Sequence, residues 1–137
     1  MVTTTTEKLV TAADKNAALG EKYYKALNSK NLSEVVPLLH PEIQFISPMV
    51  ELRGQPSALE AMKRFSGLAR SITIRAKFGS ENQAMLVYDV DFGDPIGISR
   101  SATLMLFRDG LISRIETFYD ARPFDQNLKK DANLASK

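Results

Sequence analysis

The stretch QAMLVYDVDFGDPIGISRSATLMLFRDGLISRIETFYD, residues 83–120, decides the fold. Its alternation of apolar and polar residues predicts three strands, over about 83–92, 98–107 and 111–119. The loop GDPIG separates the first two, and the Asp109-Gly110 pair is a strong tight-turn signal before the third. Strands connected by such short turns pair antiparallel.

The residues before this stretch predict three helices and two more strands. Thr11 and Asp14 have the spacing of a capping box, which places the start of the first helix. Pro56 suits the first position of the third helix, and Gly67 suits its C-terminal cap. The predicted elements are helices over 11–27, after residue 31 and over 56–67, and strands over 43–47 and 71–78.

Helices followed by a run of strands predict an α+β domain. We expect a cone-shaped, curled antiparallel sheet, covered on its concave face by the three N-terminal helices. Residues 11–124 would form this single domain, residues 1–10 a flexible N-terminus, and residues 125–137 a polar C-terminal tail.

Composition excludes several classes of function. A net charge of +2 with scattered Lys and Arg argues against nucleic-acid binding. The chain has no cysteine and one histidine, so disulfides and a zinc site are not expected, and a cytoplasmic location fits. No apolar run approaches the length of a membrane span, and the first residues lack the apolar core of a signal peptide. We expect no metal and no cofactor.

Two segments carry a family resemblance: KYYKALNSKNLSEVVPLLHPEIQFISP, residues 22–48, and LFRDGLISRIETFYDARPF, residues 106–124. With the helix after Gly54, they resemble the nuclear transport factor 2-like superfamily, and most closely its SnoaL-like, or ketosteroid-isomerase-like, bacterial branch. The resemblance covers about residues 22–124. It implies a conical pocket and frequent homodimers. The superfamily includes enzymes, binding proteins and interaction modules, so the fold does not decide the function.

The family's register, combined with two-residue alternation, predicts which side chains face the pocket. A register error of one residue would exchange the two faces. The predicted inward sets are Met85, Val87, Asp89 and Asp91; Ser101, Thr103, Met105 and Phe107; and Ser113, Ile115, Thr117 and Tyr119. The opposite face would carry Ala102, Leu104, Leu106, Ile112 and Phe118. That face is too apolar to stay in water, which predicts a homodimer through the outer sheet face.

Asp89 is the predicted catalytic residue. In an apolar cavity, desolvation would raise the pKa of its carboxyl group toward neutrality, which suits a general base. Asp91 on the same face would raise that pKa further. The alternative is that both carboxylates lie where the sheet opens to water.

Known catalytic sets of similar proteins match only in part. Tyr23 falls on the position of the catalytic tyrosine of ketosteroid isomerases, but Ser47 and Thr103 occupy the positions of the base and the protonated acid. In limonene epoxide hydrolases, which the ending YDARPF resembles, the aspartate of the last strand falls on Thr117 here. Tyr23 therefore has two interpretations, a catalytic group or a core tyrosine, and the sole histidine, His40, is expected to pack or cap.

We expect the remaining predicted site residues to bind a ligand. They are Phe45, Ser47, Met62, Phe65, Val87, Asp91, Thr103, Met105, Thr117 and Tyr119. The first functional hypothesis is a cofactor-independent isomerase, cyclase or hydrolase that acts on a small apolar substrate by general acid/base chemistry. The alternative is a non-catalytic protein that binds a small ligand or acts as a dimeric interaction module. A deep cavity with Asp89 at its floor would favour the enzyme, and a filled interior with Asp89 exposed would favour the alternative.

Overall fold

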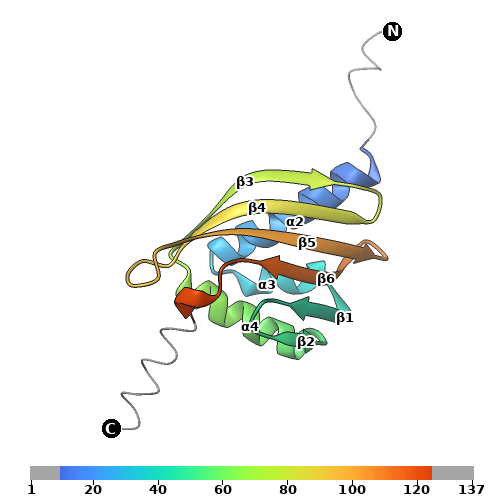
Figure 1. Cartoon of the computed structure of the whole chain (residues 1–137). Coiled ribbons are helices and arrows are strands. Elements are labelled where there is room, and N and C mark those ends of the chain that lie inside the picture. The colour runs from blue at the N-terminus through green and yellow to red at the C-terminus, as the bar shows by residue number, and fades with distance from the viewer. Residues whose placement is uncertain (1–9, 125–137) are drawn as a thin grey trace, which may run out of the picture.

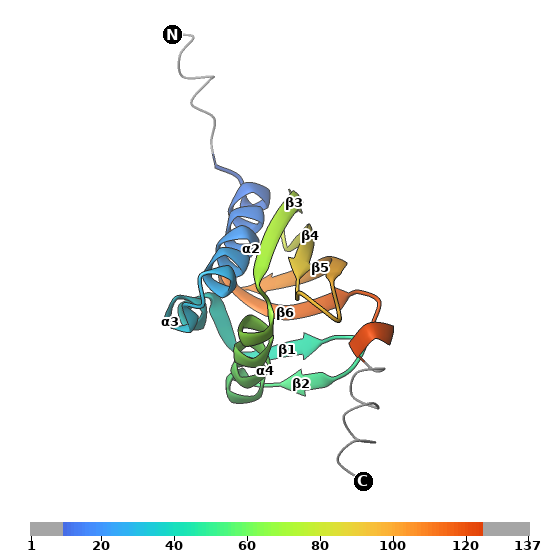
Figure 2. The same cartoon turned by 90° about the vertical axis from the view of Figure 1, so that its left-hand side faces the viewer.

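A computed structural model describes residues 10–124 of the chain. Helices pack on one face of a single curled sheet (Figures 1 and 2), so the predicted α+β layout is confirmed. The helices are α2 (Ala12–Asn28), α3 (Leu32–Val35) and α4 (Gln55–Leu68), with a 3-10 helix, η1 (Val36–Leu38), after α3. The strands are β1 (Leu39–Ile46), β2 (Glu51–Arg53), β3 (Ser71–Gly79), β4 (Gln83–Asp91), β5 (Ile98–Arg108) and β6 (Leu111–Phe118). The predicted polar tail and all but one residue of the predicted flexible N-terminus lie outside the described residues.

Helix α2 begins where the capping box predicted. The Thr11 hydroxyl accepts a hydrogen bond from the Asp14 N–H at 3.0 Å, and the Asp14 carboxylate accepts one from the Thr11 N–H at 3.3 Å. These two bonds satisfy donors that the first turn of a helix leaves without intrahelical partners. No helix within residues 10–124 is long and apolar enough to cross a membrane.

The end of α4 differs from the prediction. The helix continues through Gly67 to Leu68, and Ala69 is the C-cap residue. The Lys30 ammonium group donates hydrogen bonds to the carbonyl oxygens of Ser66 and Ala69. A cation at this place satisfies carbonyls that a helix end leaves unpaired and interacts favourably with the helix dipole. A glycine cap is therefore not needed.

The sheet has the strand order β2-β1-β6-β5-β4-β3. All neighbours pair antiparallel except β1 and β6, which are parallel, so the prediction of a purely antiparallel sheet is wrong at this one pair. The chain leaves β1 and returns to β6 only after α4 and four more strands, and so long a connection permits a parallel pair. Strand β2 was not predicted, because a strand of three residues is too short to show alternation.

The sheet register places the core. On β4, the buried residues are Ala84, Leu86, Tyr88 and Val90, which is the opposite set from the predicted one. On β5, Ser101, Thr103 and Met105 are buried, as predicted. The two sets are consistent, because Thr103 pairs with Leu86 and directly opposed residues point to the same face. The predicted register of β4 was therefore wrong by one residue, which exchanged its inner and outer faces.

Helix α2 packs closely against the sheet at Gly20. A Cβ atom at this position would lie 2.6 Å from Leu86 Cδ1 and 3.3 Å from Met105 Sδ. Both neighbours are fully buried. The glycine thus permits the contact that brings the tyrosines of α2 down onto β4 and β5.

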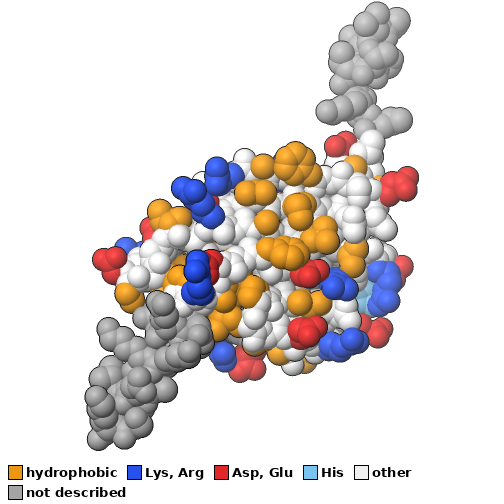
Figure 3. Space-filling model, in the orientation of Figure 1, with side chains coloured by type: hydrophobic (Ala, Val, Ile, Leu, Met, Phe, Trp, Pro, Cys, Tyr) orange, Lys and Arg blue, Asp and Glu red, His pale blue; other side chains and the backbone are white. Residues whose placement is uncertain are grey.

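The face of the sheet away from the helices carries an apolar surface, which we call the outer patch. Its alternating positions are fixed by the pairs Val87–Ala102, Met85–Leu104 and Ala102–Phe118. Figure 3 shows apolar side chains gathered over the middle of this face, with charged side chains toward its margins. The most exposed members are Ile98 (67%), Phe78 (62%), Phe118 (46%) and Met85 (37%). Ile112, predicted on this face, is instead fully buried, because a bulge between Leu106 and Phe107 pairs Ile112 with Phe107.

Candidate functional site

Three hydroxyl groups meet in the interior between α2 and the sheet. The Tyr24 hydroxyl lies 2.9 Å from that of Tyr88 and 2.6 Å from that of Thr103. The Tyr88 hydroxyl lies 2.7 Å from that of Thr103. Tyr24 comes from α2, Tyr88 from β4 and Thr103 from β5, so the cluster joins the helix layer to two adjacent strands. We call it the hydroxyl ring.

The geometry of the hydroxyl ring satisfies all its members. Each hydroxyl has one proton to donate and can accept at least one bond, so three hydroxyls in mutual contact can form a closed cycle. Burial raises the pKa of Tyr24 well above its ordinary value, and burial likewise raises that of Tyr88. The ring is therefore neutral at physiological pH, and a closed cycle leaves no proton directed at a ligand.

Apolar side chains fill the space around the hydroxyl ring. Tyr23, Leu27, Met62, Leu86 and Met105 all have at most 2% of their surface exposed. Two hollows stand out among the described residues, and neither is a cone-shaped interior pocket. One, of about 160 Å³, lies on the outer face against β1 and β2. The other, of about 330 Å³, is an open groove between α2 and β3.

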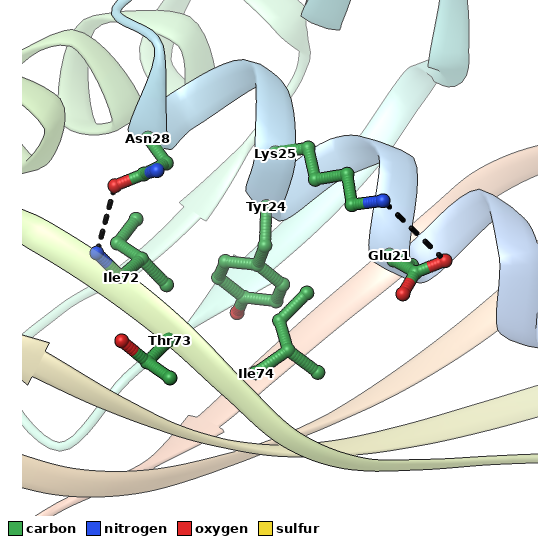
Figure 4. Close-up of a pocket in the computed structure, with 7 residues that line it drawn as sticks. All are labelled: Glu21, Tyr24, Lys25, Asn28, Ile72, Thr73 and Ile74. Atoms are coloured by element: carbon green, nitrogen blue, oxygen red, sulfur yellow. Dashed lines mark hydrogen bonds and ion pairs between the residues drawn. The ribbon is translucent and has the colours of Figure 1, made fainter.

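The groove between α2 and β3 has an apolar floor and a polar rim (Figure 4). The floor is formed by Tyr24, Ile72 and Ile74, and the rim by Glu21, Lys25, Asn28 and Thr73. The ring of Tyr24 separates the groove from the interior, because its hydroxyl points into the hydroxyl ring. The groove therefore adjoins the hydroxyl ring through Tyr24.

The predicted orientation of Asp89 is wrong. Asp89 pairs with Arg100 on β5 and alternates with the buried Tyr88 and Val90, so it lies on the outer face. Its carboxylate is 3.5 Å from the guanidinium of Arg75. Its Oδ1 is buried without a hydrogen-bond partner, but the carboxylate lies beside a cation on the outer face and not in the interior cavity on which the assignment of a general base rested.

The predicted inward positions of Asp91 and Val87 are wrong for the same reason. Asp91 accepts a hydrogen bond from the Gly93 N–H at 2.8 Å, which stabilises the turn after β4. Val87 lies on the outer face opposite Ala102. Neither residue lines the interior, because the register of β4 differs by one residue from the predicted one.

Tyr23 is a core residue, with 2% of its surface exposed and its ring edge-to-face on Tyr24 at 4.8 Å. The tyrosine that reaches Thr103 is Tyr24. Sequence reasoning missed Tyr24 and Tyr88. Tyr24 directly follows the residue chosen, and the correct register of β4 would have placed Tyr88 on the inner face.

The other predicted ligand-binding residues fall into two groups. Phe45, Thr103, Met105 and Thr117 lie on the helix-covered face of the sheet, and Met62 and Phe65 of α4 pack into the same core. Ser47 instead follows the end of β1, where its hydroxyl accepts bonds from two backbone N–H groups of the next turn. Tyr119 lies beyond β6, with its ring 5.5 Å from that of Phe124. Whether any of them binds a ligand stays a prediction.

His40 packs, as expected. Its Nδ1 accepts a hydrogen bond from the Glu42 N–H at 3.0 Å. The Arg108 Nη2 lies 3.0 Å from Nε2 and 3.3 Å from Nδ1, which places the guanidinium over the imidazole. Within residues 10–124, no group of three or more His, Cys, Asp or Glu side chains could hold a metal ion.

Comparison with protein families gives one match: the model of the SnoaL-like domain matches residues 21–115. A comparison with curated proteins gives no match. Similar crystal structures include a protein from Kribbella flavida, with a TM-score of 0.78 and 20% identity over 85% of this chain and 96% of that one. An NTF2-like protein of unknown function from Cytophaga hutchinsonii has a TM-score of 0.69 and 20% identity, over 85% of this chain and 96% of that one. A putative ketosteroid isomerase from Kribbella flavida has a TM-score of 0.70 and 21% identity, over 82% of both chains. At these identities the similarity shows the fold alone.

Proposed function

This chain belongs to the SnoaL-like domain family, and we propose that it works as a homodimeric binding domain without catalytic activity, whose subunits associate through the outer patch. The observation that carries the proposal is the exposure of large apolar side chains on one continuous face. Ile98, Phe78 and Phe118 each have between 46% and 67% of their surface exposed. Monomeric proteins rarely leave so large an apolar area in contact with water, whereas interfaces between identical subunits bury such surfaces.

The filled interior supports the same function. An enzyme of the predicted kind needs a cavity that holds the substrate against an acid or base. Here the interior holds Leu86, Met105 and the hydroxyl ring, and Asp89 lies on the outer face beside Arg75. This combination matches the alternative that the sequence left open, a dimeric interaction or ligand-binding domain.

The test is a charge placed at the middle of the outer patch. Leu104 lies on the central strand β5, opposite Met85 on one side and Glu116 on the other. Leu104→Arg should convert a dimer to a monomer, as measured by light scattering after size exclusion at micromolar concentration. Ala18→Arg on the exposed face of α2 is the control, and it should leave the dimer intact. The proposal would be refuted if the wild-type protein were monomeric or if the Leu104→Arg variant remained dimeric.

A second candidate function is isomerase-type chemistry on a small apolar ketone, in which the hydroxyl ring would stabilise the enolate oxygen and Glu21, the carboxylate that lines the adjacent groove, would take and return the substrate proton. The hydroxyl ring is the observation that favours it. Hydroxyl groups in a water-excluded site can stabilise an enolate oxygen. A similar structure is described as a putative ketosteroid isomerase. A substrate carbonyl would take the place of one partner of Tyr24, which lies between the groove and the ring.

The matched pair Tyr24→Phe and Tyr23→Phe tests this candidate. With a β,γ-unsaturated ketosteroid as substrate, Tyr24→Phe should abolish turnover and Tyr23→Phe should preserve it, because only Tyr24 belongs to the hydroxyl ring. Equal turnover by the wild type and Tyr24→Phe, or no turnover by the wild type, would eliminate acid/base catalysis at this cluster.

A further inference from the structure

The outer edge of β3 is a second surface, separate from the outer patch. Strand β3 is the last strand of the sheet order, and no described strand pairs with its far edge. It is nine residues long, from Ser71 to Gly79. An edge strand directs backbone N–H and C=O groups outward, where an added strand can pair with them.

One contact shows which backbone groups of β3 face this edge. The side-chain oxygen of Asn28 accepts a hydrogen bond from the Ile72 N–H at 2.8 Å, as the carbonyl of a neighbouring strand would. Alternate residues of a strand direct their backbone groups to the same side, so those of Ile74 also face the edge. A bulge after Ile74 then interrupts the regular pairing with β4. Because Asn28 already accepts from the Ile72 N–H, an extended chain would pair with the outward-facing backbone groups of Ile74.

The groove lies directly beside this part of β3 (Figure 4). The side chains of Ile72 and Ile74, which form its floor with Tyr24, would contact alternate side chains of an added strand. The groove is partly open to solvent, whereas small-molecule sites bury most of their ligand. Its shape and the adjacent backbone thus favour a chain over a small molecule.

Charge selects the kind of chain. Lys25 lies on the rim of the groove, and Arg75 and Lys77 follow its floor residues along β3. The exposed fractions of these three side chains are 71%, 52% and 43%, and the Arg75 guanidinium lies 3.5 Å from the Asp89 carboxylate on the outer face. Glu21 is the one acid on the rim of the groove, and its carboxylate accepts a hydrogen bond from the Lys77 ammonium at 2.8 Å. That bond lowers the pKa of Glu21, so the pair is ionised. With Asp89 beside Arg75 included, three cations and two acids leave an excess of one positive charge along β3 and the groove.

The same charges exclude a second copy of this chain. Antiparallel pairing of β3 with the β3 of another molecule would place Arg75 and Lys77 near their own counterparts, and like charges on adjacent strands repel. An acidic strand would meet these cations favourably. We propose that the β3 edge and its groove bind an extended, acidic peptide segment of a partner protein, which adds to the sheet as a further strand.

Binding can be measured with two labelled peptides of equal length, one alternating valine with glutamate and the other alternating valine with lysine. We expect the acidic peptide to bind, as followed by fluorescence anisotropy, and to shift the backbone amide signals of residues 72–74. The lysine peptide should bind about tenfold more weakly or not at all, since it meets Lys25, Arg75 and Lys77 with like charge. An acidic peptide that is N-methylated on alternate amides should lose binding, because it cannot pair with the edge.

A matched pair of charge reversals locates the site on the protein. Arg75→Glu should weaken the acidic peptide about tenfold, and Arg64→Glu, on the exposed face of α4, should leave its affinity unchanged. Equal binding of the two unmethylated peptides, unchanged binding of the N-methylated peptide, or amide shifts confined to the outer patch would overturn the proposal. Absence of binding by the acidic peptide at millimolar concentration would also overturn it.

Discussion

The substitution Thr103→Val tests whether the hydroxyl ring stabilises the fold. Valine has nearly the same shape as threonine, so the change removes the hydroxyl with little change in packing volume. Thr103 is fully buried, and its hydroxyl lies 2.6 Å from that of Tyr24 and 2.7 Å from that of Tyr88. Two of the three contacts of the ring disappear, and the Tyr24–Tyr88 contact at 2.9 Å remains.

The expected loss follows from those contacts. A neutral hydrogen bond contributes about 1 kcal/mol net, and a buried donor without a partner costs about 1–3 kcal/mol. In the valine variant, two phenol hydroxyls share one hydrogen bond, so one O–H proton has no acceptor in the ring. We expect the free energy of unfolding to fall by about 2–3 kcal/mol. For a domain of this size, that corresponds to a decrease in Tm of about 6–12 °C.

Urea denaturation followed by far-ultraviolet circular dichroism measures this loss, since the chain contains no tryptophan. Thr103→Ser keeps the hydroxyl and should lose about 1 kcal/mol for the missing methyl group. Thr117→Val is the position control, because its hydroxyl is half-buried and makes only a long bond of 3.4 Å to the Ile46 carbonyl. A stabilising role of the hydroxyl ring would be refuted if Thr103→Val lowered the free energy of unfolding no more than Thr103→Ser or Thr117→Val.

Three further outcomes are expected. Gly79→Ala should lower the free energy of unfolding by several kcal/mol, about 3 or more, because its Cβ would lie 2.0 Å from the Ala13 carbonyl oxygen; Gly67→Ala, which meets nothing within 4 Å, should instead stabilise by about 0.5–1 kcal/mol in the same urea titration. Lys30→Met should cost about 1 kcal/mol of thermal stability, since it removes the cation at the end of α4, and an unchanged Tm would refute that role. Burial raises the pKa of three of the four tyrosines above that of the unfolded chain, so stability should be complete below about pH 10 and fall as pH rises above it. Phenolate absorbance should then show that these three tyrosines ionise only as the protein unfolds. Ionisation of all three well below the pH of unfolding would contradict this prediction.

The sequence predicted the elements of this fold well where local chemistry determines them. The capping box at Thr11 and the tight turn at Asp109-Gly110 each depend on a few adjacent residues, and both occur where predicted. The end of α4 was missed because it depends on Lys30, which is remote in sequence from the carbonyls it satisfies. Capping by a distant side chain leaves no local pattern.

The candidate site could be predicted less well, because it depends on register. Both faces of β4 carry apolar residues, so alternation alone did not distinguish Met85 and Val87 from Leu86 and Tyr88. Strand β5 was placed correctly, and its pairing fixes β4, since Thr103 lies opposite Leu86. If that one pair is known, alternation along β4 places Tyr88 in the interior and Asp89 on the outer face.

The stability of Asp89→Asn provides a direct test of that register. The substitution keeps the shape of the side chain and removes its charge. On the outer face beside Arg75, at 3.5 Å and with 32% of the Asp89 side chain exposed, the loss of the ion pair should change the free energy of unfolding by at most about 1 kcal/mol. In an apolar cavity, the same change would remove the cost of burying a carboxylate, and the protein should become markedly more stable at neutral pH than at acidic pH relative to the wild type. Urea titrations of both proteins at neutral and at acidic pH separate the two cases. A small difference that is similar at both values supports the outer position of Asp89, and a large stabilisation confined to neutral pH would return it to the interior.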